Sequence, residues 1–163
     1  MTARKKLHLP DYLPYLVNRV GSALVARFTA DALEAHGLTI VMWRVLVVIA
    51  DMGPQRQVDL SALTSIDVST LSRIVTRLMR RGLVSRARSA ESNREVTVAL
   101  TPKAKALVAE LIPIARELQE TATAGLPAGA VSAAKAALRQ MFDNLEGSGA
   151  KKTPRTASRT RRV

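Results

Sequence analysis

The sequence has no cysteine, few aromatic residues and no long apolar run, and each shortage narrows the possible functions. The absence of cysteine excludes disulfides, thiolate metal sites, cysteine nucleophiles and thiol redox sensing. Aromatic residues make up 3% of the chain and hydrophobic residues 47%, so Ala, Val and Leu must build most of the core. This composition favours helices with at most a small sheet. The 163 residues suffice for one compact domain.

Segments typical of membrane proteins or exported proteins are also missing. The longest apolar run, residues 45–50, is too short to span a bilayer. The first residues, "MTARKKLHLPDYL", lack the apolar stretch of a signal peptide. We therefore expect a cytoplasmic protein without a membrane partner. Surface binding of lipid through residues 147–163 has little support, because they include no lipidation motif or amphipathic helix.

Acidic residues are scarce, with 13 Asp and Glu against 25 Lys and Arg, which gives a formal charge of +12. Residues 147–163 hold six of these basic residues and no acid, so residues 1–146 still carry +6. Such an excess indicates a polyanionic partner, either nucleic acid or an acidic membrane surface. The segment 147–163 has no apolar face to bury, and we expect a basic disordered tail there.

No pattern typical of catalysis occurs in the sequence. It has no nucleophile–base pair, no phosphate-binding glycine loop and no metal triad. His8 and His36 are the only histidines, and they do not belong to a ligand cluster. We therefore expect no enzymatic activity, no cofactor and no bound metal.

Apolar spacing and turn residues predict a helical chain with one hairpin. Thr39 and Asp67 are placed to cap helices, and Gly82 is placed to end one. The helix after Thr39 is apolar nearly all round, which predicts a central buried position. The predicted helices cover residues 10–36, 40–52, 57–66, 68–81, 102–123 (with a kink at Pro113) and 131–145, and the strands cover 83–89 and 94–101.

A helical wheel divides residues 68–81 into two faces. Leu71, Ile74, Val75 and Leu78 share the apolar face, and Ser69, Arg73, Thr76, Arg77 and Arg80 share the opposite one. A recognition helix has this division, because hydroxyls and arginines can reach base edges and phosphates in the major groove. The alternative is a solvated basic face. The short helix before and the basic hairpin after, with Arg86, Arg88 and Arg94, favour a winged helix-turn-helix.

The sequence from about Tyr12 to Leu145 resembles the MarR-type transcriptional regulators. The segment "VSTLSRIVTRLMRRGLVSR" is similar to the family's recognition helix and the strand after it. The segments "LTIVMWRVLVVI", "VDLSALTSI" and "REVTVALTPKAKAL" resemble the second helix, the third helix and the entry into the long dimerisation helix. Each piece alone is a weak signal, whereas the four in this order are specific.

The resemblance implies a mainly α fold with a small β-hairpin in a single domain, residues 1–146. Residues 38–101 would form the winged helix lobe, while residues 10–36 and 102–146 would supply dimerisation helices. A homodimer with two recognition helices about one turn of DNA apart would bind a pseudo-palindromic operator. The alternative for the terminal helices is an intramolecular bundle.

The resemblance also implies roles for individual residues. Ser69, Thr70, Ser72 and Arg73 match positions that face bases or nearby phosphates, and Arg77 matches a phosphate contact. Arg94 matches the wing-tip arginine that enters the minor groove. Ser92 stands where the family often has an Asp that holds this arginine. Either Arg94 is therefore less preorganised, or Glu91 or Glu95 replaces the Asp.

An effector pocket is implied between the dimerisation helices and the DNA-binding lobe. The candidates for it are Tyr15, Asn18, Arg19, Trp43 and Arg44. An arginine beside aromatic surface suits an anionic aromatic ligand, and the charge also admits an acyl-CoA thioester. As alternatives, Trp43 is a core residue, and Arg19 and Arg44 are surface or salt-bridged residues. The identity of the effector does not follow from the sequence.

These observations predict a dimeric, sequence-specific DNA-binding repressor that a small molecule releases from its operator. The alternative is a ligand-independent basic architectural DNA-binding protein, which the basic tail favours because its contacts add salt-dependent, unselective affinity.

Overall fold

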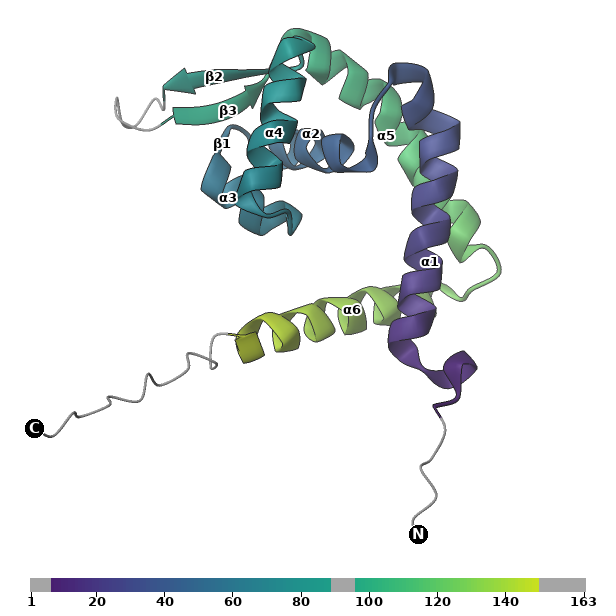
Figure 1. Ribbon diagram of the computed structural model, residues 1–163. Helices are drawn as coiled ribbons and strands as arrows, with labels where there is room; N and C mark the ends of the chain where they lie inside the picture. The colour runs from purple at the N-terminus through teal and green to yellow at the C-terminus, as the bar shows by residue number, and fades with distance from the viewer. Residues whose placement is uncertain (1–6, 89–95, 150–163) are drawn as a thin grey trace, which may run out of the picture. The chain divides into compact units, whose positions relative to one another are not determined.

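The computed structural model describes residues 7–88 and 96–149, which are mainly helical with one three-stranded antiparallel sheet (Figure 1). The chain divides into two compact units, Met1–Ala122 and Thr123–Val163, and each is described by itself. In chain order, the elements are η1 (Leu9–Asp11), α1 (Leu13–Phe28), η2 (Thr29–Leu33), η3 (Glu34–His36), α2 (Ile40–Met52), β1 (Gln55–Arg56), α3 (Gln57–Thr64), α4 (Val68–Arg80), β2 (Val84–Arg88), β3 (Val96–Leu100), α5 (Pro102–Thr123) and α6 (Ala128–Gly149).

The first long helix ends where predicted but begins at Leu13, three residues later than predicted, and it is not uniform. After α1, the chain makes one π-helical segment, η2, and one 3-10 turn, η3, before it reverses at Gly37. Gly37 has a left-handed φ of 58°, a conformation that glycine adopts without steric cost. The amide of Leu38 donates to the carbonyl of Leu33, and the amide of Gly37 donates to that of Glu34. This pair of bonds ends the rod formed by α1, η2 and η3.

Helix α2 is the centre of the core, as its sequence predicts. The Thr39 hydroxyl accepts a hydrogen bond from the amide of Met42 at 3.3 Å, which confirms the predicted N-cap. Five α2 side chains are buried, and the Trp43 ring packs against Phe28 with the ring centroids 5.2 Å apart. This packing fixes the end of α1 against the start of α2.

A tight turn joins α3 and α4 into the predicted helix-turn-helix. Ser65 occupies the turn with a left-handed φ of 53° and ends α3 at Thr64, two residues earlier than predicted. The Ser61 hydroxyl donates to the carbonyl of Ile66 at 2.6 Å across the turn. Leu60 and Ile66 are buried beneath it, so the turn rests on the core.

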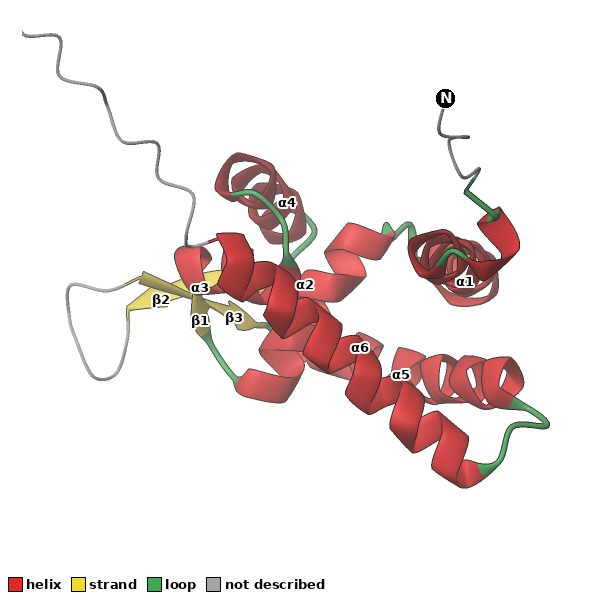
Figure 2. Cartoon of the chain, turned by 90° about the horizontal axis from the view of Figure 1, so that it is seen from below, coloured by secondary structure: helices red, strands yellow, loops and turns green. Residues whose placement is uncertain are grey.

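The predicted hairpin of β2 and β3 is confirmed (Figure 2). It belongs to a three-stranded sheet of order β1-β3-β2. In β2 and β3, Val84 pairs with Leu100 and Arg88 pairs with Val96. The predicted hairpin tip lies outside the described residues. The two-residue strand β1 was not predicted, because so short a segment has no readable alternation.

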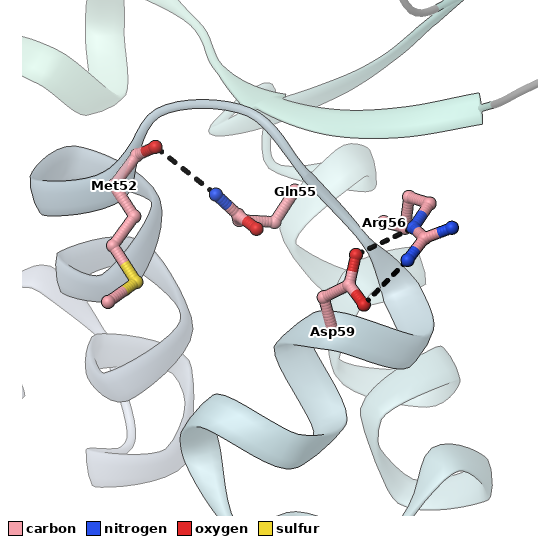
Figure 3. Close-up of polar contacts among 4 residues, drawn as sticks. All are labelled: Met52, Gln55, Arg56 and Asp59. Atoms are coloured by element: carbon pink, nitrogen blue, oxygen red, sulfur yellow. Dashed lines mark hydrogen bonds and ion pairs between the residues drawn. The ribbon is translucent and has the colours of Figure 1, made fainter.

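Side chains shape the turn around β1 (Figure 3). The Gln55 amide nitrogen donates to the carbonyl of Met52 at 3.1 Å and closes the end of α2. The Arg56 guanidinium donates to both carboxylate oxygens of Asp59, at 2.6 and 3.0 Å. These local bonds place β1 against β3, where Gln55 pairs with Val98.

The two C-terminal helices differ from the predictions mainly at their ends. Helix α5 has the predicted bounds, and Pro113 lies inside it; the kink expected there stays a prediction. Helix α6 covers residues 128–149 rather than 131–145. The prediction of a disordered tail from residue 147 is therefore wrong for residues 147–149, because a formed helix continues for a turn through weak helix formers. The other tail residues lie outside the described part of the chain.

Candidate nucleic-acid interface and effector groove

Helix α4 is attached to the core by one face, as the helical wheel predicts. The side chains of Leu71, Ile74, Val75 and Leu78 are buried, and three of them have no exposed surface. On the opposite face, Arg73, Arg77 and Arg80 are exposed. Together with Ser72 and Thr76 they line a shallow hollow of about 310 Å³. The helix thus presents three guanidinium groups in one row, which suits a polyanion.

The first turn of α4 is organised by Asp67. The Asp67 carboxylate accepts hydrogen bonds from the Thr70 amide at 2.9 Å and from the Ser69 hydroxyl at 2.6 Å. The Ser69 hydroxyl, and after it Thr70, hold the pKa of Asp67 well below its usual range. The predicted N-cap is confirmed, and it remains an anion at neutral pH.

The last turn of α4 is held by a main-chain hydrogen bond and by the side chain of Arg81. The amide of Leu83 donates to the carbonyl of Leu78, and Gly82 turns the chain with a left-handed φ of 67°. The Arg81 guanidinium donates to the carbonyls of Gly37, at 2.6 Å, and of His36. These carbonyls belong to the reversal after η3, so Arg81 joins the end of α4 to the end of the α1 rod.

Contacts around Arg81 also involve a third helix, α5. The Lys103 ammonium, on α5, donates to the carbonyl of Arg81 at 3.3 Å. The His36 imidazole lies 3.5 Å from the Glu110 carboxylate, also on α5. The sequence analysis missed this function of Arg81, because its acceptors are backbone carbonyls 44 and 45 residues away and have no sequence signal. Its place in "RRG" before a helix stop was the only hint.

The wing arginines predicted from the sequence are only partly described. Arg86 is exposed on β2, and its guanidinium donates to the side-chain oxygen of Gln57 at 3.2 Å. Arg88 lies at the end of β2 opposite Val96. Arg94 and Ser92 lie outside the described residues, as do Glu91 and Glu95. The geometry of the wing tip therefore stays a prediction.

Two of the five candidate effector residues meet in one hollow of the described part of the chain. Asn18 and Arg44 line a groove of about 710 Å³ along α1, together with Val17, Gly21 and Val25. Arg19 lies over the ring of Tyr15 instead, with 5.7 Å from the guanidinium carbon to the ring centroid. Trp43 is buried against Phe28, which agrees with its alternative interpretation as a core residue. Their contributions to ligand binding stay predictions.

Two further features of residues 7–88 and 96–149 concern metal binding and membrane crossing. No group of three or more His, Cys, Asp or Glu side chains in these ranges could hold a metal ion. No single helix among them is long and apolar enough to cross a membrane. The helical segments Leu13–His36 and Ile40–Met52 have the length and apolar composition of a membrane span only when they are taken together, and an 82° bend separates them.

Comparisons with known proteins agree with this geometry. Residues 38–96 match the model of the MarR family. NicR of Pseudomonas putida, an HTH-type transcriptional repressor, is 36% identical over 85% of this chain and 87% of its own length. BpsR of Bordetella bronchiseptica, whose DNA binding is regulated by 6-hydroxynicotinic acid, is 29% identical with a TM-score of 0.75, covering 85% of this chain and 99% of that one. A regulator from Silicibacter pomeroyi is 26% identical with a TM-score of 0.75, covering 93% and 100%.

The match to NicR extends over most of both chains, well beyond the winged helix segment that the family model covers. A winged helix-turn-helix is an arrangement that enters the major groove of DNA, and the exposed arginine row of α4 has the charge that suits a polyanion. Regulators of this kind act by binding DNA and not by catalysis. The chain belongs to the MarR family, and it is a DNA-binding transcriptional repressor.

Proposed function

We propose that the protein represses transcription as a homodimer on a pseudo-palindromic operator, and that a small aromatic carboxylate releases it. The observation that carries the proposal is the row of Arg73, Arg77 and Arg80 on the exposed face of a helix whose other face is buried. A rigidly held helix can enter the major groove with its polar face forward. The hydroxyls of Ser69, Thr70, Ser72 and Thr76 lie on that face, beside the arginines.

Dimerisation is supported by apolar side chains that stay exposed on α1. Leu13, Leu16, Val17 and Val20 follow one another at helical spacing, and each is between 40% and 58% exposed. Helix α6, in the second unit, has a similar series in Leu138, Phe142 and Leu145. Such contiguous apolar surface is typical of a protein–protein interface. A two-fold dimer would cover it and repeat the recognition helix.

The effector site is proposed in the groove that Asn18 and Arg44 line. Arg44 offers a guanidinium for a carboxylate, Asn18 offers an amide for a ring nitrogen or hydroxyl, and the other lining residues are mainly apolar. A second hollow of about 440 Å³, between α2, β3 and α5, has Lys105 as its one charged lining residue. The groove with two polar groups suits a small heteroaromatic acid better.

The likeness to BpsR supports the choice of ligand class, because 6-hydroxynicotinic acid regulates DNA binding in that protein. We therefore propose a hydroxylated heteroaromatic carboxylate in preference to an acyl-CoA thioester. A groove along α1 and α2 lies beside the lobe that carries α4. A ligand that prefers one separation of these helices would shift the population away from the DNA-binding form.

The DNA-binding part of the proposed function is tested by footprinting the DNA upstream of the protein's own gene in the presence of bulk competitor DNA. A protected site that persists is expected. Arg73→Ala should weaken the specific complex by roughly 1–3 kcal/mol and relax the preference at one base pair. Equal affinity for random duplex would instead support the architectural protein that the basic composition also allows. Deletion of residues 147–163 should lower the salt dependence and keep the footprint.

The effector part of the proposed function is tested by titrating 6-hydroxynicotinic acid, nicotinic acid and benzoyl-CoA against the complex of protein and operator DNA. We expect release by the first compound and a rise in the melting temperature of the free protein. Arg44→Ala should abolish both effects and leave operator affinity unchanged. Arg19→Ala is the matched control, because Arg19 lies on Tyr15 and does not line the groove. Release that survives Arg44→Ala would exclude this groove.

A further inference from the structure

The hydroxyl groups on the polar face of α4 are not equivalent, because two of them, on Ser69 and Thr76, have already donated their proton. The Ser69 hydroxyl donates to the Asp67 carboxylate at 2.6 Å. The Thr76 hydroxyl donates to the carbonyl of Ser72 at 2.9 Å. Each of these oxygens keeps its lone pairs, so each can accept a further hydrogen bond but has no proton left to donate.

Asp67 makes this assignment firm in the first turn. Its carboxylate can only accept, so the bonded Ser69 hydroxyl must point its proton at it. A hydrogen bond to an ionised carboxylate is shorter and stronger than one between neutral groups. The bonds from Ser69 and Thr70 hold the pKa of Asp67 far below its usual range, so the carboxylate is charged at neutral pH. Turning the Ser69 hydroxyl outward would break its bond to this carboxylate.

The donors of this face lie further along the helix. In the described part of the chain, the guanidinium groups of Arg73, Arg77 and Arg80 make no hydrogen bond or ion pair with other residues. They donate only, and they suit phosphates or the O6 and N7 acceptors of guanine. The polar face therefore has an acceptor end in the first turn and a donor row after it.

Duplex DNA offers few partners for an acceptor. Phosphate oxygens accept hydrogen bonds and cannot satisfy an oxygen that has no proton to give. In the major groove, the donors are the N4 amino group of cytosine and the N6 amino group of adenine. Guanine and thymine present only acceptors at the corresponding positions, and these would face the lone pairs of Ser69 unfavourably.

We propose that the first turn of α4, through Ser69 ordered by Asp67, selects an amino-bearing base, adenine or cytosine, at one position of each operator half-site. Ser69 is thereby a specificity-determining residue, and Asp67 is a positioning residue that acts through it. The inference rests on the proposed function, in that α4 must enter the major groove. The inference goes beyond the proposed function by naming the chemical group of the base that this turn recognises.

The experiment starts with selection of binding sites from a randomised duplex library by the full-length protein. In the selected site, each base of the half-site is then replaced by an analogue without its amino group, purine for adenine or pyrimidin-2-one for cytosine. At one position we expect the analogue to weaken binding about fivefold or more, the effect of one lost hydrogen bond. Guanine or thymine at that position should weaken it at least as much.

Variant proteins connect this position to Ser69. With Ser69→Ala, the analogue and the natural base should bind equally well at that position, while the preferences elsewhere stay. Ser72→Ala is the matched control, since Ser72 lies on the same face without a described side-chain hydrogen bond, and it should keep the amino preference. Asp67→Ala, which frees the Ser69 proton, should reduce the preference for adenine and cytosine over guanine and thymine.

Three outcomes would overturn the inference. One is a uniform loss of affinity for all sequences with Ser69→Ala, which is the behaviour of a phosphate contact. Another is a preference for guanine or thymine at the position that Ser69→Ala affects. The last is an analogue effect that Ser69→Ala does not remove. A library that yields no consensus at all would instead refute sequence-specific binding, and with it the proposed function.

Discussion

Helices α4 and α1 are both amphipathic, yet only α4 buries its apolar face within the chain. Leu71 and Leu78 of α4 have no exposed surface, whereas Leu16 and Val20 of α1 are 40% and 58% exposed. Burial of an apolar side chain contributes in proportion to the area removed from water. The apolar face of α4 therefore stabilises the single chain, whereas that of α1 is available for the proposed contact with a second chain. In this proposal, α4 carries the DNA-reading surface, and α1 determines how many copies of that surface act together.

The largest effect is expected from placing a charge on the exposed face of α1. Val20→Asp should give a folded monomer, because two unpaired carboxylates in a two-fold interface would cost several kcal/mol each. Sedimentation equilibrium measures the loss of the dimer, and circular dichroism checks that helix content is kept. Arg27→Ala, an exposed change on the same helix, should leave the dimer intact. A Val20→Asp dimer of normal affinity would contradict the proposed role of α1.

Within α4, the corresponding change removes a buried side chain. Leu78→Ala should lower the free energy of unfolding by about 2–5 kcal/mol, since it leaves a cavity in the core. The control is Met79→Ala, the neighbouring residue, which is 38% exposed and should change stability by roughly 0.5 kcal/mol or less. Urea denaturation of the two variants measures the difference. Equal losses would mean that α4 is not anchored by the face described above.

A smaller effect is expected at the junction between the two helices. Arg81→Ala removes two charge-assisted hydrogen bonds to the carbonyls of His36 and Gly37, and should cost about 1–3 kcal/mol of stability. It should also weaken operator binding, because the end of α4 loses its attachment to the α1 rod. Arg80→Ala should weaken operator binding while leaving the melting temperature unchanged. If both variants melt like the wild type, the attachment contributes nothing.

The smallest effect concerns Asp67 and depends on pH. The folded pKa of Asp67 lies below its unfolded value of about 3.9, so its contribution to stability is present above that value and is lost as the pH falls toward the folded pKa. The wild type should therefore exceed Asp67→Asn in melting temperature at pH 7, by an amount that shrinks below about pH 4. Ser69→Ala, which removes the largest cause of the shift, should make this pH dependence weaker. A constant difference across this range would refute the assignment.

Local signals allowed much of the fold to be predicted from the sequence. Thr39 and Asp67 cap their helices as predicted, because N-caps act within three residues. The buried face of α4 follows from helical periodicity alone. The strand β1 was missed because its pairing with β3 joins segments about forty residues apart. The added turn of α6 was missed because helix ends depend on small energy differences.

The candidate site was less accessible to prediction. Residue types and positions on α4 could be read from the sequence, but the direction of the Ser69 hydroxyl could not, since it depends on the placement of the Asp67 oxygen. The groove beside Asn18 and Arg44 depends on the packing between α1 and α2. This packing brings together two of the five residues that the sequence predicted for the effector site. Arg81 gave little signal, because its nearest hydrogen-bond acceptors, the carbonyls of His36 and Gly37, are main-chain atoms.

The attachment of Arg81 has an evolutionary consequence. Its acceptors are carbonyl oxygens, which every amino acid supplies, so the contact makes no demand on side chains at positions 36 and 37 apart from the left-handed turn at Gly37. This contact therefore does not restrict which amino acid occupies position 36. Position 81, in contrast, needs a long side chain with two donors that point apart. Covariation between homologous sequences should therefore link position 81 only weakly to position 36, although Arg81 joins two helices that are distant in the chain.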